Sequence, residues 1–175
     1  MTGLSHRLGR AARKLAWQAL RGGPGRRPRI LTVPTANGLL SFSNMDVLNA
    51  KGLFVQREWE IDLIRRSVAY LESEGYGRPS GADVLVDAGA NIGMICIAML
   101  REGHFREALA FEPYPDHVAL LARNIEQNGM KERIRPYPCA LSDAAGEAQI
   151  ELSEINAGDH SARSAEIRAR IVHVA

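Results

Sequence analysis

The chain has 175 residues, of which 46% are hydrophobic and 24% are charged. This composition is typical of a globular domain with a sizeable core, and no apolar run approaches the ~18 residues of a membrane span. It therefore argues against fibrous, disordered and membrane-spanning classes. The two cysteines, Cys96 and Cys139, lack metal-ligand spacing. We expect reduced core thiols, no metal site and a cytoplasmic location.

The net charge of +2 is unevenly distributed, because residues 1–30 hold eight basic residues and no acidic residue. Within this leader, apolar residues recur at helical spacing. The pattern predicts a helix that is solvated or loosely docked, and the alternatives are a basic helix at a membrane surface or against nucleic acid, or a transit peptide. Because Trp17 is the only aromatic residue available there for stacking, we expect no nucleic-acid partner. The apolar positions are Leu4, Leu8, Ala12, Leu15 and Ala19.

Glycines at residues 22–25 indicate a linker after this helix. Residues 29–43 then predict a β-hairpin, since Asn37 and Gly38 form a strong hairpin-turn signal between two apolar runs. Residues 57–74 carry apolar side chains at helical spacing and predict an amphipathic helix.

The most informative segment is residues 84–93, Val-Leu-Val-Asp-Ala-Gly-Ala-Asn-Ile-Gly, which leads into an apolar helical stretch over residues 92–101. Its three apolar residues predict a buried strand that ends at Asp87. Gly89 and Gly93 allow a tight turn and the close approach of a ligand to the backbone. With the free N–H groups of a helix start, this pattern indicates a nucleotide-type cofactor cradle. A strand-to-helix turn without a ligand is the alternative.

The spacing within this cradle distinguishes between cofactors. The dinucleotide fingerprint needs a bare backbone at its second glycine, where this chain has Asn91. The Asp87 carboxylate repels phosphate and suits an ammonium group. S-adenosylmethionine carries an ammonium and a sulfonium and no phosphate, so we favour it over a nicotinamide dinucleotide.

A second acidic residue ends the next predicted strand, over residues 108–113. Glu112 follows the cradle at about the distance expected for the carboxylate that accepts hydrogen bonds from ribose hydroxyls. A helix over residues 115–128 and a strand over residues 133–139 come next. After that strand we expect a turn that contacts adenine, formed by Ala140, Leu141 and Ser142.

Strand, helix, strand, helix and strand in this order predict an α/β fold with a doubly wound, mostly parallel, Rossmann-like sheet. Its ligand crevice would lie at the carboxyl ends of the strands. Further strands are expected over residues 147–152, beside the third strand, and over 170–174. We divide the chain into a basic leader and linker (1–28), a hairpin and helix (29–80), and a cofactor-binding core (81–175).

The cradle and the segments after it resemble the FkbM-type S-adenosylmethionine-dependent methyltransferases. The resemblance rests on VLVDAGANIG, AFEPYPDHVALLARNIEQNG and CALSDAAGEAQIEL, and it covers residues 50–175. It implies a class I methyltransferase fold and methyl transfer to an oxygen of a small-molecule or glycan-like acceptor. It also implies that Glu112 occupies the ribose position. The first cofactor motif of the family would comprise Asp87, Gly89, Asn91 and Gly93.

No residue of the chain stands out as catalytic, because methyl transfer from a sulfonium depends largely on proximity and orientation. His160 beside Asp159 is the one local acid–base pair, and a surface-loop histidine is the alternative. The family pattern continues with an Ile-Lys-Ile-Asp strand and Glu-Gly that these residues lack, so we expect missing C-terminal strands. Two other hypotheses stay open: a non-catalytic remnant without cofactor, and an NAD-dependent oxidoreductase.

Overall fold

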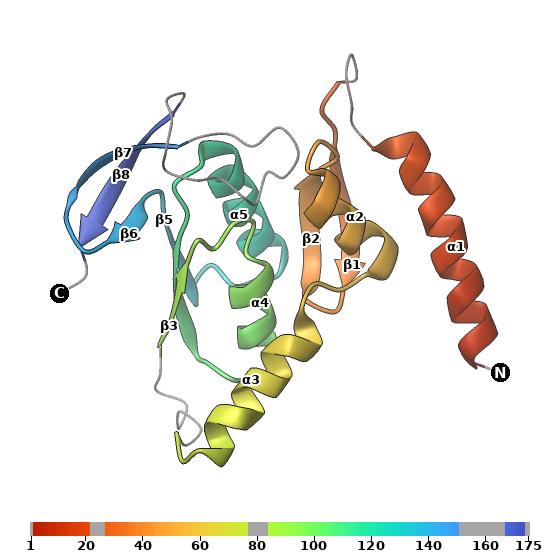
Figure 1. Cartoon of the computed structure of the whole chain (residues 1–175), viewed down its shortest axis with the longest axis horizontal. Coiled ribbons are helices and arrows are strands. Elements are labelled where there is room, and N and C mark those ends of the chain that lie inside the picture. Colours follow the sequence, from red (N-terminus) through yellow and green to blue (C-terminus); the bar gives the residue numbers. More distant parts are fainter. Residues whose placement is uncertain (1, 22–26, 77–83, 151–166, 174–175) are drawn as a thin grey trace.

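The computed structural model describes residues 2–21, 27–76, 84–150 and 167–173 (Figure 1). An N-terminal helix and a hairpin with a short helix form one side of the molecule, and a parallel sheet with its helices forms the other. In chain order the elements are α1 (Thr2–Leu20), β1 (Ile30–Thr35), β2 (Gly38–Ser43), α2 (Val47–Gln56), α3 (Ile61–Ser73), β3 (Val84–Ala88), α4 (Met94–Arg101), β4 (Glu107–Phe111), α5 (Pro115–Gln127), β5 (Ile134–Tyr137), β6 (Ala140–Ser142), β7 (Gly146–Ile150) and β8 (Ile167–His173).

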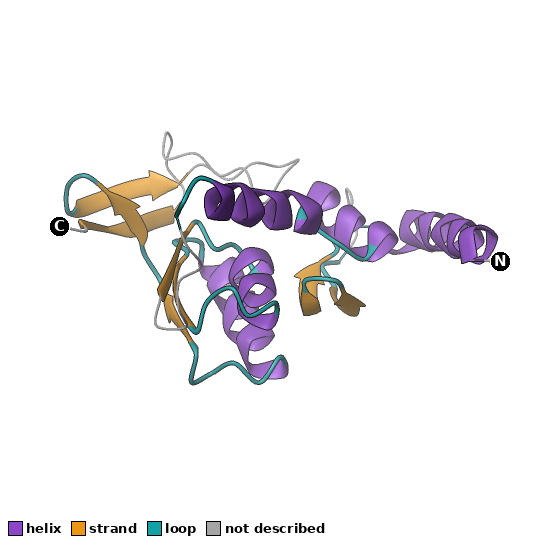
Figure 2. Ribbon diagram, turned by 90° about the horizontal axis from the view of Figure 1, so that it is seen from below, coloured by secondary structure: helices purple, strands orange, loops and turns teal. Residues whose placement is uncertain are grey.

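The central sheet consists of three parallel strands in the order β3-β4-β5. Helices α4 and α5 connect these strands and pack on one face of the sheet (Figure 2). Ala108, Ala110 and Ile134 point to that face and are buried, whereas Val84 and Val86 on the opposite face are 46% and 52% exposed. The predicted α/β class with a mostly parallel sheet is confirmed. Parallel pairing brings the carboxyl ends of β3 and β4 together at one edge.

The later strands form a separate sheet in the order β6-β8-β7. We expected residues 147–152 beside the third strand, and this was wrong, because β7 pairs antiparallel with β8. Pro136 and Pro138 lack the N–H donors that a neighbouring strand would need, so β5 is a poor partner. The predicted strand over residues 170–174 is β8, which begins earlier, at Ile167.

The predicted hairpin is confirmed, although its two turn residues are Ala36 and Asn37, since Thr35 pairs with Gly38. Asn37 is fully buried, and its side chain serves a long-range role. Its Nδ2 donates to the carbonyl oxygens of Trp59 (2.8 Å) and Met94 (3.1 Å), and its Oδ1 accepts from Trp59 N (2.8 Å). This amide therefore joins the hairpin to the start of α3 and the start of α4.

The helix predicted over residues 57–74 begins only at Ile61, because Arg57 and Glu60 both adopt positive φ angles, 67° and 51°. These residues turn the chain between α3 and the unpredicted helix α2. Asp46 caps α2 by accepting a hydrogen bond from Asn49 N at 3.0 Å. Ile61 is the one buried residue of α3.

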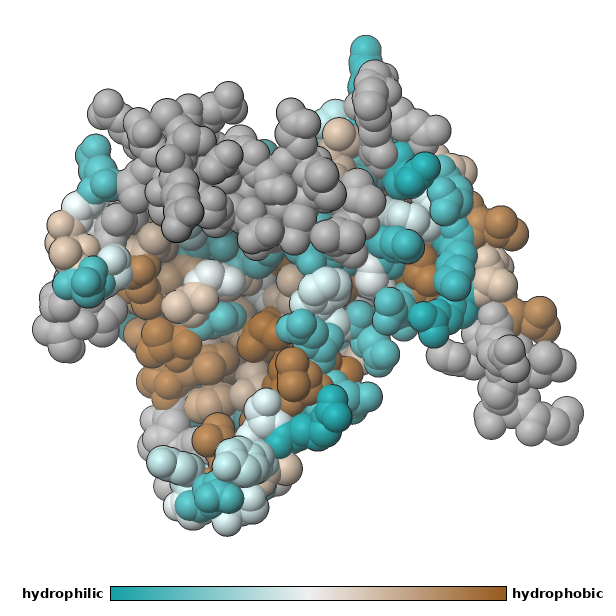
Figure 3. Space-filling model, in the orientation of Figure 1, coloured by the Kyte–Doolittle hydropathy of each residue, from teal (hydrophilic) through white to brown (hydrophobic). Residues whose placement is uncertain are grey.

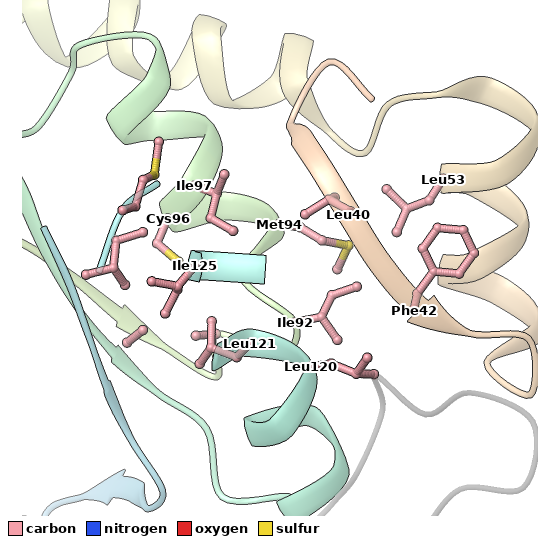
Figure 4. Close-up of a cluster of buried hydrophobic side chains, with 14 of the residues drawn as sticks. Leu40, Phe42, Leu53, Ile92, Met94, Cys96, Ile97, Leu120, Leu121 and Ile125 are labelled. Carbon is pink, nitrogen blue, oxygen red and sulfur yellow. The ribbon is translucent and has the colours of Figure 1, made fainter. Parts of the chain in front are cut away.

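The hydrophobic core extends from the helices α4 and α5 past β2 to α2 (Figure 4). Leu40 and Phe42 of β2 belong to it, with Phe42 on the side of Leu53 of α2, and buried Asn124 of α5 fixes the contact between α5 and β2. The Nδ2 atom of Asn124 donates to Ser41 O (3.1 Å) and Ile92 O (2.8 Å), and its Oδ1 accepts from Ser41 N (2.7 Å). The hairpin thus shares its core with the sheet's helices, and the predicted division at residue 80 stays a prediction.

Helix α1 confirms the predicted N-terminal helix, and it docks on α2. Trp17 is 1% exposed, and its ring centroid lies 5.7 Å from that of Phe54. Arg13 Nε donates to Val55 O at 2.8 Å. None of the helices described is both long and apolar enough to cross a membrane.

Candidate functional site

The candidate site is the turn of residues 89–93, between β3 and α4, together with Glu112 just beyond the end of β4. The N–H groups of Gly89 and Ala90 both donate to Phe111 O at 2.9 Å. Gly93 N donates to Ala90 O at 2.8 Å, and α4 starts directly after it. The turn is therefore fixed to the end of the neighbouring strand, as the sequence pattern predicts for a cradle.

The two glycines of the turn serve different purposes, although both have positive φ angles, 79° at Gly89 and 89° at Gly93. A Cβ placed on Gly93 would lie 2.8 Å from Leu121 Cδ1 and 3.0 Å from Ile97 Cδ1, so this glycine permits packing. A Cβ placed on Gly89 would meet no atom of the described residues within 4 Å. Gly89 therefore leaves open space beside the backbone, where a ligand can approach.

Glu112 is 6% exposed, and both of its carboxylate oxygens bind backbone. Oε2 accepts from Asn91 N at 2.8 Å, and Oε1 accepts from Tyr114 N at 2.9 Å. His117 Nδ1 lies 3.7 Å from Oε1. Each carboxylate oxygen has a second lone pair, so Glu112 can hold the turn and still accept a hydrogen bond from a ligand hydroxyl.

Asn91 combines two unusual features. It is a non-glycine residue with a φ of 51°, and its Oδ1 atom is buried without a hydrogen-bond partner among the described residues. A buried unpaired acceptor destabilises a protein unless a donor reaches it. A ligand N–H or O–H group would supply that donor.

Asp87 faces α4, and its Oδ2 accepts from Cys96 N at 3.2 Å. Burial raises the pKa of the Asp87 carboxyl, the hydrogen bond from Cys96 opposes that rise, and the Glu112 charge adds to it. Burial and the Asp87 charge raise the pKa of the Cys96 thiol well above its ordinary value. Cys96 is thus an unreactive core thiol, as predicted, and the site carries two neighbouring acidic groups.

The N–H groups of this turn are largely used within the protein. Those of Gly89, Ala90, Asn91 and Gly93 all donate to the protein's own oxygens. A pyrophosphate needs such donors, and it would also face the Asp87 and Glu112 carboxylates. The arrangement suits a ligand with a positive charge and hydroxyl groups, and it disfavours a dinucleotide.

The residues expected to contact adenine form a strand, where the sequence predicted a turn. Ala140, Leu141 and Ser142 form β6 and pair in parallel with β8. Their contact with a cofactor stays a prediction. The predicted acid–base pair of His160 and Asp159 lies outside the described residues, and no group of three or more potential metal ligands occurs among those that are described.

Two further features were missed by sequence reasoning. The rings of Phe111 and Tyr137 stack at the ends of β4 and β5, with centroids 4.8 Å apart. A cavity of ≈ 310 Å³ lies at the α2–α3 junction, and Glu58, Trp59 and Glu60 are among its lining residues. The aromatic residues at two strand ends were visible in the sequence, whereas the cavity depends on the unpredicted turn before α3.

Comparisons with known proteins found a short similarity to one curated protein and a likeness to solved structures. No protein-family model matches the chain. Over 62 residues it is 40% identical to the methyltransferase sdnD of Sordaria araneosa, a match that covers 35% of this chain and 24% of that protein. The match thus spans about a quarter of the length of this curated relative.

Two solved structures from Methanocaldococcus jannaschii are also similar. Trm5 in complex with adenosine is 21% identical, with a TM-score of 0.44, over 65% of this chain and 31% of that chain. A tRNA m1G37 methyltransferase is 22% identical, with a TM-score of 0.42, over 66% and 31% of the two chains. The expectation that nucleic acid is no partner is contradicted here, because one similar structure is a tRNA methyltransferase. The FkbM resemblance stays a prediction.

Proposed function

We propose that this chain is an S-adenosylmethionine-dependent methyltransferase that binds its cofactor in the cradle of residues 87–93 and Glu112. The observation that carries the proposal is the open side of Gly89, next to two carboxylates and an unpaired Asn91 oxygen. The similarity to a curated methyltransferase supports it independently.

Each cradle residue has a chemical role in this proposal. The Asp87 charge attracts the ammonium group, and the second lone pairs of Glu112 accept from the ribose hydroxyls. Asn91 Oδ1 accepts from a donor on the ligand, and Gly89 leaves the ligand its space. When bound, S-adenosylmethionine supplies a methyl group on a sulfonium, which an acceptor nucleophile displaces in line.

The acceptor follows from the FkbM resemblance, which implies a hydroxyl group of a small molecule or glycan. In this proposal Asp87 and Glu112 hold the cofactor, so neither is assigned as a base for the acceptor hydroxyl. Proximity and orientation of the bound methyl group would carry much of the rate. Acceptor assays should therefore test RNA beside small molecules and glycans.

Calorimetric titration with S-adenosylhomocysteine tests the cofactor proposal. We expect saturable binding by the parent chain and none by Gly89→Val, because the valine side chain fills the open space. Gly103→Val is the matched control, since Gly103 also has a positive φ, 77°, and open space around it, but lies in the turn after α4. Equal binding by a folded Gly89→Val variant would refute the cradle assignment.

The oxidoreductase alternative predicts a change in NADH fluorescence when protein is added. We expect no change, because the turn's N–H groups already donate within the protein. The remnant alternative predicts that a folded chain gives no calorimetric signal with S-adenosylhomocysteine and no change in NADH fluorescence. The two titrations together therefore separate all three functions.

A further inference from the structure

His117, in the first turn of α5, is buried beside the Glu112 carboxylate. It is 5% exposed, and its Nδ1 atom lies 3.7 Å from Glu112 Oε1. This separation is longer than a hydrogen bond, so the contact between the two groups is electrostatic. A bare nitrogen lone pair at Nδ1 would repel the carboxylate. Glu112 therefore favours the form of the imidazole in which Nδ1 carries a proton.

Tyr114 fixes the orientation of the His117 ring. The two rings meet edge to face, with centroids 4.8 Å apart and an interplanar angle of 85°. The Tyr114 hydroxyl donates to Asp116 Oδ2 at 3.0 Å, which anchors the phenol ring. The backbone N–H of Tyr114 donates to Oε1 of Glu112, the same oxygen that His117 faces. Tyr114 thus holds the imidazole and the carboxylate next to each other.

The Glu112 carboxylate needs positive charge nearby. It is 6% exposed, and removal of a carboxylate from water destabilises its charged form unless a partner compensates. Burial and, in addition, the Glu112 charge raise the pKa of Asp87, so the two carboxylates repel each other. The backbone N–H groups of Asn91 and Tyr114 bring only partial charges to Glu112.

His117 is the side chain that can supply this charge. Among the described residues it is the only one with a basic group in ion-pair contact with Glu112. The exposed side chains of β3, the strand that leads into the cradle, are apolar, with Val84 and Val86 among them. Figure 3 shows this apolar surface over β3. The strand therefore brings no cation to the site.

A second pair of histidine and glutamate in the described structure differs in this respect. His104 Nε2 lies 3.4 Å from Glu102 Oε2, but Arg65 Nη2 also lies 2.7 Å from Glu102 Oε1. The arginine already compensates the charge of Glu102. Glu112 thus depends on His117 more strongly than Glu102 depends on His104.

An ionised carboxylate is what the two hydroxyls of a ribose require. The bonds from Asn91 N and Tyr114 N use one lone pair on each oxygen of Glu112. The second lone pair of each oxygen can then accept from one ribose hydroxyl. A protonated carboxyl group would present an O–H donor in place of one of these acceptors.

We propose that His117 is a positioning residue of the cofactor site, which keeps the Glu112 carboxylate ionised and oriented and so sets the preference for a nucleoside with both ribose hydroxyls. The proposal rests on the proposed function, because the contact of Glu112 with ribose belongs to it. His117 acts through Glu112 and needs no contact with the ligand. A nucleoside without these hydroxyls therefore gains nothing from His117.

Calorimetric titrations of the full chain with adenosine, and with the dideoxyadenosine that lacks both vicinal hydroxyls, test the proposal. Adenosine has no ammonium group, so attraction by Asp87 does not contribute. We expect the parent chain to bind adenosine at least about tenfold more tightly than the dideoxy analogue. His117→Leu should reduce this preference by about two- to tenfold, because it weakens the binding of adenosine alone.

Two further variants separate positioning from packing. His117→Asn can still direct an amide N–H toward Glu112 Oε1, and it should keep the preference of the parent chain. His104→Leu is the matched control, because it removes a histidine beside a glutamate at the opposite end of α4 from the cradle, and it should leave both affinities unchanged. Circular dichroism confirms that each variant is folded. His117→Met replaces His117→Leu if leucine prevents folding.

The outcomes distinguish this proposal from the cofactor assignment. An unchanged preference in the folded leucine or methionine variant would overturn the proposal. Equal weakening of both nucleosides would make His117 a packing residue and overturn it as well. In both cases the parent chain still binds adenosine, so the cofactor assignment survives. Absence of adenosine binding by the parent chain would refute the cofactor assignment and the proposal together.

Discussion

The Glu112 carboxylate accepts a hydrogen bond from the backbone N–H of Asn91 at 2.8 Å, so the residue just beyond β4 fixes the turn that follows β3. A second bond, from Tyr114 N at 2.9 Å, occupies the other carboxylate oxygen. Glu112 is therefore part of the turn's framework as well as a candidate ligand for ribose. Binding and stability should change together when it is replaced.

We expect Glu112→Ala to lower the free energy of unfolding by about 2–4 kcal/mol and to weaken S-adenosylhomocysteine binding. The substitution leaves two backbone N–H groups without their charged acceptor in a buried place. Urea denaturation and calorimetry measure the two effects. Glu107→Ala is the control, because the ion pair of Glu107 with Arg135 is solvent-accessible, and its loss should cost under about 1 kcal/mol. Equal losses in both variants would mean that the carboxylate of Glu112 does not hold the turn.

The two glycines of the turn should respond differently to alanine. Gly93→Ala brings a Cβ to 2.8 Å from Leu121 Cδ1 at a positive φ, and it should lower the free energy of unfolding by about 2–4 kcal/mol. Gly89→Ala meets no described atom and should cost about 1 kcal/mol of backbone strain, while it reduces cofactor affinity. Thermal melts with and without S-adenosylhomocysteine distinguish them. If Gly89→Ala lowered the free energy of unfolding more than Gly93→Ala does, the two glycines would not have the separate roles assigned to them.

The elements around the cradle could be predicted because their signals are local. Two apolar runs end at Asp87 and at Glu112, and a glycine or proline comes soon after each. Such a pattern predicts the end of a strand from the local sequence alone, without knowledge of the tertiary structure. The distinction between Gly89 and Gly93 was not visible, because it depends on the position of Leu121 in a helix far along the chain. The same holds for the bond between Glu112 and Asn91.

Helix α2 escaped prediction because its central Gly52 is typical of loops. The tertiary structure explains this glycine, because a Cβ on Gly52 would lie 2.9 Å from the Trp59 ring. Arg57 and Glu60 turn the chain without a glycine, so no local signal marks the start of α3. Asn37 likewise gives a hairpin signal, although its side chain is held by residues of two distant elements.

Asn37→Ala should destabilise the fold by about 2–4 kcal/mol, although the residue lies in a hairpin turn. It removes the partners of Trp59 N, Trp59 O and Met94 O in a buried place. Because Met94 starts α4, affinity for S-adenosylhomocysteine should fall as well. Asn128→Ala is the control, since its side chain binds Leu39 at a partly exposed position and should cost about 1 kcal/mol. A loss no larger than that of the control would show that Asn37 acts only as a turn residue.

Asp87→Asn should make the protein more stable at neutral pH and impair cofactor binding. Burial raises the pKa of Asp87 above its ordinary value of 3.8, so the folded state disfavours the charged carboxylate. Above the raised pKa this destabilises the fold, and the penalty disappears as the pH falls below 3.8, where the group is protonated in both states. Asparagine retains an oxygen that can accept from Cys96 N and carries no charge.

The gain in stability of Asp87→Asn should therefore be present at about pH 7 and absent at about pH 3. Urea denaturation at both values measures it, and Asp116→Asn on the exposed first turn of α5 is the control. Calorimetry at neutral pH should show weaker binding of S-adenosylhomocysteine by Asp87→Asn, because the charge that attracts its ammonium group is gone. A variant that is less stable at neutral pH, or that binds as tightly as the parent, would place the Asp87 carboxylate in the framework of the fold and outside the cofactor site.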